Sequence, residues 1–251
     1  MSREAENRIY SAVYDISYFQ HTRSAQLPCF IRWKDLAIPP FVHATTLRKH
    51  FMTQEIPRTI LASFSGTIRS RILAYSGGLR QTWLKQFMDS KRVSVVSAEP
   101  PSAHAGAAIK ADYKSNFVTQ MLRSVFCLCP AGWATWTPRV FEALALGCIP
   151  VIVGSPTTHT RAVAMPFEDA GVDWSSLALF ISYRQATRGL LEVLDAVPTR
   201  KVHQMQAAIS RAWTHFVYPE RLYETHSRRG GGAMHWVIEH LRKRLPSSLR
   251  V

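Results

Sequence analysis

Long apolar runs are missing from this chain. The opening segment, Met1–Gln26, holds no apolar run of signal-peptide or transmembrane length. The most apolar long stretch, Val140–Val153, contains Glu142, Gly147 and Pro150 and is too short to span a bilayer. We therefore expect a soluble chain without a transmembrane segment.

Cysteine is scarce as well. Four cysteines are too few for a disulfide scaffold, and the Cys-x-Cys pair at 127 and 129 does not have zinc-finger spacing. The three later cysteines lie in apolar sequence, and we expect buried thiols at Cys127, Cys129 and Cys148. The count leaves the redox compartment open.

Acidic residues are few, with 17 Asp and Glu against 31 Lys and Arg, for a formal net charge of +14. Such an excess favours polyanions, anionic membrane surfaces or phosphorylated ligands. The cations are scattered, as at Arg69, Arg71 and Arg80, and concentrate only in the tail, at Arg228–Arg229 and Arg242–Arg244. A solvated basic surface is the simplest interpretation, and binding of a polyanion, such as an acidic glycan, through the tail is the weaker alternative. Nucleic acid is not expected as a partner, because no finger spacing or aromatic RNA-binding motif accompanies the charge.

Paired carboxylates with metal-ligand spacing are also lacking. Asp169 and Asp173 are four residues apart and do not form an Asp-x-Asp motif, and no other pair suggests Mg²⁺ or Mn²⁺. No metal cofactor is expected.

Hydrophobic residues make up 47% of the chain, which is enough for a globular core. Near-continuous apolar strands alternate with helical patterns, which indicates an α/β fold with a parallel sheet covered on both faces. The expected strands are Thr59–Phe64, Val93–Val96, Val125–Cys129, Ile149–Val153 and Leu177–Ile181. The expected helices are Leu79–Met88, Tyr113–Leu122, Pro138–Leu146, Arg188–Val197, Arg200–Val217 and Met234–Leu245.

The most informative segment is Ser124–Val153. A strand ends at Cys129, a glycine-containing turn follows through Gly132, and Thr137 is a good N-cap residue before Pro138 at the first helical position. A strand, a glycine loop and a helix N-terminus together form an anion-binding arrangement at the carboxyl ends of the strands.

Arg139 and Glu142 lie on one face of the helix that follows. Arg139 falls in the first turn, within reach of a phosphate, and Glu142 is placed to accept hydrogen bonds from ribose hydroxyls. The alternative is an Arg–Glu pair at i, i+3 that only stabilises the helix, by about 0.2–0.5 kcal/mol.

This segment resembles the signature of exostosin-like glycosyltransferases. Its S-x-F-C-L-x-P-x-G, T-x-R-x-x-E-A and G-C-x-P-V-I elements occur in the family's order. Further likenesses follow the same order, at Trp33–Pro40, Arg58–Gly66, Met165–Phe167, Val172–Trp174, Met205–Gln206 and His215–Phe216.

The resemblance implies the GT-B fold, in which the C-terminal of two Rossmann-like domains holds the donor. It implies inverting transfer of a sugar from a nucleotide diphosphate donor, typically a UDP-sugar, to a glycan hydroxyl in the Golgi. By motif position, Arg139 would contact the diphosphate and Glu142 the ribose. Gly66 and Gly132 would let the backbone approach the donor, and Thr137 would open the helix. The diphosphate would then be stabilised by the protein and not by a metal.

The resemblance also predicts the domain organisation. Residues 1–56 would be a remnant of the acceptor-side domain, 57–225 the Rossmann-like donor domain, and 226–251 a C-terminal helix and basic tail. Because the acceptor lobe is so short, the alternative function is a catalytically inactive fragment that binds a nucleotide sugar or acidic glycan.

Several single residues stay open. Family members often carry Arg where this chain has Ser65, and Arg69 or Arg71 are candidates to replace that charge. The catalytic base is unknown; His159 is the best-placed histidine, whereas a structural role is expected for His215 and no partner is identified for His104. Trp133 and Trp136 either stack on a nucleobase or sugar, or pack in the core.

Overall fold

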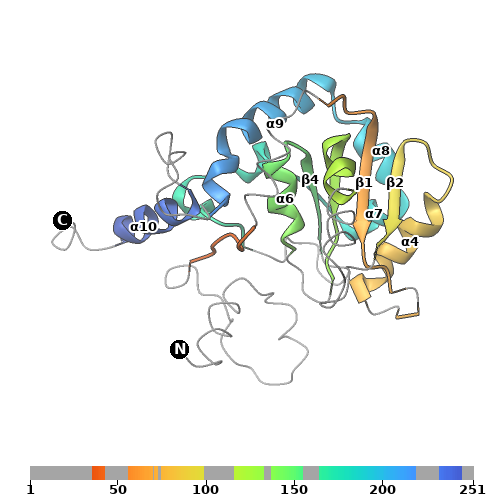
Figure 1. Cartoon of the computed structure of the whole chain (residues 1–251), viewed down its shortest axis with the longest axis horizontal. Coiled ribbons are helices and arrows are strands. Elements are labelled where there is room, and N and C mark those ends of the chain that lie inside the picture. Colours follow the sequence, from red (N-terminus) through yellow and green to blue (C-terminus); the bar gives the residue numbers. More distant parts are fainter. Residues whose placement is uncertain are drawn as a thin grey trace.

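The computed structural model describes residues 36–42, 56–69, 71–72, 75–98, 116–132, 137–154, 164–218 and 232–244. Its centre is a five-stranded sheet in the order β2-β1-β3-β4-β5, in which all neighbouring strands are parallel (Figure 1). The strands are β1 (Ile60–Gly66), β2 (Val93–Ser97), β3 (Ser124–Cys129), β4 (Ile149–Val153) and β5 (Leu179–Ile181). Each expected strand is confirmed to within two residues at either end.

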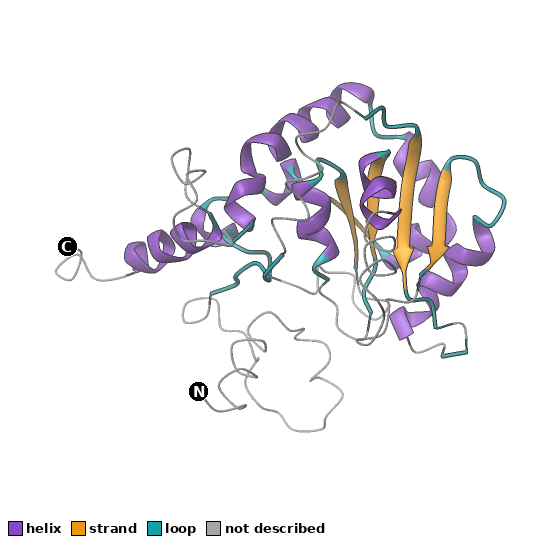
Figure 2. Cartoon of the chain, viewed as in Figure 1, coloured by secondary structure: helices purple, strands orange, loops and turns teal. Residues whose placement is uncertain are grey.

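Helices cover both faces of this sheet, which confirms the Rossmann-like α/β prediction (Figure 2). On one face α4 (Leu79–Gln86) packs against α7 (Tyr183–Arg188), where the Trp83 indole donates to the Ala186 carbonyl at 2.7 Å, and α8 (Leu190–Asp195) follows. The other face carries α6 (Arg139–Ala145) and α9 (Thr199–Ala212). Residues 116–122 are also helical, and the last described helix is α10 (Ala233–Arg244).

The helix expected at Arg200–Val217 is wrong at its end, because α9 stops at Ala212 and the 3-10 turn η4 (Trp213–Phe216) follows. The helix expected at Arg188–Val197 is α8, and α7, which ends directly before Gly189, is not among the expected helices. A capping box fixes the start of α7: the Ser182 hydroxyl accepts from the Gln185 amide, and the Gln185 side chain accepts from the Ser182 amide.

An aromatic cluster holds α6 against the rest of the domain. Phe141 on α6 meets Trp174 edge to face at 6.2 Å between centroids, and Trp174 lies 5.0 Å from Phe216. Trp174 belongs to the 3-10 turn η3 (Trp174–Ser176), and Phe216 ends the turn η4 (Trp213–Phe216). Pairs of this kind add about 0.5–1.5 kcal/mol each beyond their burial. They fix α6 in place.

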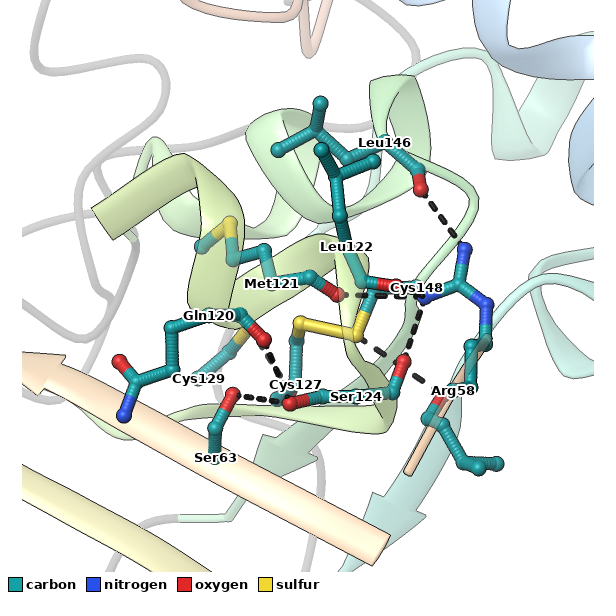
Figure 3. The surroundings of a disulfide bond; sticks show 11 residues. Arg58, Ser63, Gln120, Met121, Leu122, Ser124, Cys127, Cys129, Leu146 and Cys148 are labelled. Atoms are coloured by element: carbon teal, nitrogen blue, oxygen red, sulfur yellow. Dashed lines mark hydrogen bonds between the residues drawn. A yellow bond between two sulfur atoms is a disulfide. The ribbon is translucent and has the colours of Figure 1, made fainter. Parts of the chain in front are cut away.

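The prediction of three buried thiols is wrong for two of the cysteines. Cys127 in β3 and Cys148, directly before β4, form a disulfide, while Cys129 is a buried free thiol (Figure 3). The physical reason is strand register. β3 and β4 are parallel neighbours with Phe126 opposite Ile149, which brings the two Cα atoms to 5.8 Å across 21 residues of sequence.

Arg58 lies next to this disulfide and joins the ends of two helical segments (Figure 3). Its guanidinium donates to the carbonyls of Met121 at 3.2 Å and Leu122 at 3.1 Å, and to the Leu146 carbonyl at 2.8 Å. Carbonyls at helix ends lack partners within the helix, so a cation that binds several of them stabilises both ends at once.

Within the described residues, no helix has both the length and the apolar character that crossing a bilayer requires.

Candidate functional site

The topology of the sheet marks one place for a ligand. The chain leaves β1 for β2 on one side and later returns to β3 on the other, so β1 and β3 are neighbours at the point where the strand order reverses. In open α/β sheets, ligands bind outside the carboxyl ends of the strands at such a switch point. Here these ends are Gly66 and Cys129.

Arg139 reaches from α6 to the end of β1. Its guanidinium carbon lies 4.6 Å from the centroid of the Phe64 ring and 5.4 Å from that of Phe117. A Cβ atom built on Gly66 would meet its Nη2 at 2.8 Å. Its Nε is buried without a hydrogen-bond partner. A buried donor without a partner is costly, and this nitrogen is free to donate to a bound group.

Glu142 lies one turn further along α6 and is partly buried. Burial raises the pKa of its carboxyl group, while the nearby Arg139 charge lowers it. Among the contacts of the described residues, no ion pair joins these two side chains. The geometry therefore does not favour the simple helix-stabilising pair that their spacing allows.

The expected start of α6 is shifted by one residue: Pro138, and not Thr137, is the N-cap residue, and the N-cap residue makes no side-chain hydrogen bond to the helix. Thr137 Oγ1 accepts from the Arg139 amide at 3.4 Å, and Pro138 has helical dihedrals, φ −59° and ψ −21°. α6 spans only seven residues, so positive charge at this edge comes mainly from side chains.

Gly132 faces a second guanidinium. A Cβ atom at Gly132 would lie 3.4 Å from Nη2 of Arg80 and 3.6 Å from the Tyr75 hydroxyl. The structure thus places Gly66, Gly132 and the Arg139 side chain at or beside the carboxyl edge of β1 and β3, and Thr137 and Glu142 at the start of the adjoining α6. Their roles toward a donor stay predictions.

Arg80 is the residue that the sequence reasoning missed. It is 7% exposed, and its guanidinium carbon lies 5.1 Å from the Phe64 centroid and 4.8 Å from that of Tyr75. Burial is the main cause that lowers the pKa of Arg80 to about 10, and the charge of Arg139 contributes to this lowering. A signal existed: Arg80 stands on the face formed by Trp83, Leu84 and Phe87, where the helical period calls for an apolar residue.

Arg69 and Arg71, the candidates to replace the arginine that family members often carry at the position of Ser65, lie at the surface. Arg69 is exposed and its guanidinium carbon lies 5.7 Å from the Tyr75 centroid, and Arg71 is exposed too. At the turn itself, Arg80 Nη1 donates to the Thr67 carbonyl at 3.0 Å.

Three other candidates have structural contacts. His215 packs against Trp236 with 4.2 Å between ring centroids, and both burial and His235 lower its pKa. Asp173 caps η3 by accepting from the Ser175 amide at 3.0 Å. Asp169 pairs with Arg244 and lies 3.1 Å from the His240 ring nitrogen. Trp133, Trp136, His104, His159 and Arg228–Arg229 lie outside the described residues.

No group of three His, Cys, Asp or Glu side chains that could hold a metal ion occurs in the part of the chain that the structure describes. A metal-independent site stays a prediction.

Comparisons with known proteins agree with the sequence pattern. The sequence model of the Exostosin GT47 domain matches residues 7–197. A protein of Oryza sativa subsp. japonica named "Probable glucuronosyltransferase GUT1" is 29% identical over 211 residues, covering 84% of this chain and 46% of the relative. A protein of Arabidopsis thaliana named "Probable beta-1,4-xylosyltransferase IRX10" is 26% identical over 218 residues, with the same two shares. The chain thus spans about half the length of these relatives.

Proposed function

Because the chain belongs to the Exostosin GT47 domain family, we propose that it carries the nucleotide-sugar-binding part of a GT-B glycosyltransferase. The observation that carries this proposal is the position of Arg139. It brings a cation, with one buried donor still open, to the carboxyl edge of β1 at the strand-order switch. A diphosphate matches this environment in charge and in acceptor geometry.

In this proposal the donor lies across the ends of β1 and β3. Arg139 contacts the diphosphate, and Glu142, one helical turn away, accepts hydrogen bonds from the ribose hydroxyls. Gly66 and Gly132 leave the space that the guanidinium groups occupy. Thr137 holds the start of α6.

The proposed reaction is transfer with inversion. The oxygen of a glycan hydroxyl attacks the anomeric carbon of the donor, the bond from that carbon to the diphosphate oxygen breaks, and the hydroxyl proton passes to a base. The chain's contribution is to stabilise the charge that develops on the leaving diphosphate, through Arg139. The relatives' names mention glucuronosyl and xylosyl transfer, which supports a UDP-sugar as donor and a glycan as acceptor.

The disulfide supports a Golgi location for this activity. Disulfides persist in oxidising compartments of the secretory route and are rare in the cytosol. A structural bond between Cys127 and Cys148 fits a protein that works in the lumen.

Calorimetric titration of UDP into the wild-type chain and Arg139→Ala tests the donor site. We expect binding to the wild type and at least about tenfold weaker binding to the variant, as for loss of a charge-assisted hydrogen bond. Arg92→Ala is the matched control, because Arg92 is exposed and pairs with Asp195. Equal affinity of Arg139→Ala and the wild type would remove the donor site.

Binding without turnover is the second candidate. It is favoured by the coverage of the relatives, since this chain aligns with 46% of their length. Donor hydrolysis and transfer to oligosaccharide acceptors distinguish the two candidates, and robust turnover would exclude the second.

A further inference from the structure

Arg80 connects the two backbone turns that border the candidate site. Its side chain comes from α4, and its Nη1 donates to the Thr67 carbonyl at 3.0 Å, directly after β1. Its Nε donates to the Ala131 carbonyl at 3.1 Å and its Nη2 to the Pro130 carbonyl at 3.3 Å, both directly after β3. One guanidinium group therefore joins the chain after β1 to the chain after β3.

Tyr75 orients this guanidinium. Arg80 Nη1 also donates to the Tyr75 hydroxyl at 2.7 Å, and the Tyr75 ring lies 4.8 Å from the guanidinium carbon. All three nitrogens of the planar fork thus have acceptors on three segments. A lysine, with a single ammonium centre, cannot reproduce this arrangement.

Burying the Arg80 guanidinium group costs free energy of desolvation. Burial, together with the charge of Arg139, lowers the pKa of Arg80 to about 10. Both guanidinium carbons lie near the Phe64 ring, at 5.1 Å and 4.6 Å from its centroid. No carboxylate of the described residues forms an ion pair with either arginine. Burial keeps the nearby Cys129 thiol neutral by raising its pKa to about 12. A buried Arg80 and a partly buried Arg139, neither of them in an ion pair, are two like charges that an anion bound between them would stabilise.

We propose that Arg80 is a positioning residue of the anion site. Its fork holds the turns after β1 and β3 at the separation that a diphosphate needs, so that Arg139, in the space left by Gly66, reaches the ligand. This inference rests on the proposed function, since it assigns a role within the same donor site.

The test uses Arg80→Gln and Arg80→Lys, with UDP and uridine as probes. UDP affinity is measured by calorimetry, uridine affinity by ligand-observed NMR, and folding by thermal unfolding. We expect both variants to bind UDP about tenfold or more weakly and uridine as the wild type does, because the defect is confined to the phosphate cradle. UDP affinity within twofold of wild type in either variant overturns the proposal, and so does an equal loss for uridine, which would indicate general damage.

If the Arg80 variants do not fold, Tyr75→Phe tests the positioning role of Arg80 instead. It removes only the hydroxyl that orients Arg80, and we expect it to weaken UDP binding by about threefold or more. Unchanged UDP affinity in a case where Arg80 cannot be replaced would overturn the proposal. Arg139→Ala separates this failure from that of the donor site. If Arg139→Ala loses UDP while Arg80→Gln keeps it, the donor site stands and only the role of Arg80 falls.

Discussion

Gly66 and the Arg139 guanidinium share one space: a Cβ atom built on Gly66 would lie 2.8 Å from Nη2 of Arg139. The same atom would lie 3.2 Å from the Phe64 ring. The absence of a side chain at the end of β1 is therefore what allows Arg139 to reach this edge of the sheet.

Gly66→Ala is expected to push the Arg139 guanidinium away from the end of β1. We expect about tenfold weaker UDP binding in calorimetry, with little change in thermal unfolding, because the guanidinium can move where a backbone could not. Gly154→Ala is the control, since its Cβ would meet only ordinary contacts, the nearest at 3.6 Å. Wild-type affinity in Gly66→Ala would show that Arg139 does not need this position.

Replacing the disulfide by Cys127→Ser and Cys148→Ser together is expected to destabilise the fold. A cross-link across 21 residues of sequence constrains the unfolded chain by about 3 kcal/mol in the chain-entropy description. Chemical denaturation measures the loss, and non-reducing peptide mass mapping shows the linked pair directly. Reductant should lower the stability of the wild type and leave the double variant unchanged. Recovery of unlinked Cys127 and Cys148 peptides from the native protein would refute the bond.

The sheet could be predicted from the sequence because parallel strands buried on both faces are continuous apolar runs. Ile149–Val153 has no polar residue, and its bounds are the same in sequence and structure. The start of α7 could not be found in this way, because it depends on a capping box, Ser182 with Gln185, and not on apolar period. The cysteine pairing depends on the register of β3 against β4, which composition does not contain.

Part of the candidate site could be predicted from local sequence, and the part that depends on long-range contacts could not. Arg139 and Glu142 stand in a local strand–turn–helix pattern, so their positions follow from nearby residues. Arg80 acts across sequence separations of about 50 residues, toward Pro130 and Ala131, and its role depends on β1 and β3 being neighbours. The only sequence signal for Arg80 was a charged residue on an otherwise apolar helix face.

Arg58→Met is expected to lower stability by about 2 kcal/mol, because carbonyls at the ends of two helical segments lose a charged donor. Burial lowers the pKa of Arg58, so the neutral Met recovers part of the desolvation cost. Denaturant titration measures the difference. Arg92→Ala is the comparison, because its ion pair with Asp195 is exposed and such pairs contribute little to stability. A smaller loss for Arg58→Met than for Arg92→Ala would contradict the interpretation.

Donor binding is expected to weaken on acidification at a higher pH than for an ordinary glutamate. Burial raises the pKa of Glu142, and only its ionised form offers all its oxygens to the ribose hydroxyls. As the pH falls through this raised pKa, the carboxyl group takes up a proton and loses acceptor capacity.

UDP-glucose is the suitable probe for this test, because UDP itself has a terminal phosphate that titrates at about pH 6. A raised carboxyl pKa also means that protonation favours the folded state, so this loss of affinity is not a loss of fold. Calorimetry across the acid range should show the decline in the wild type and a flat profile, at lower affinity, in Glu142→Gln. An equal decline in both proteins would assign the titration to another group and take the ribose role away from Glu142.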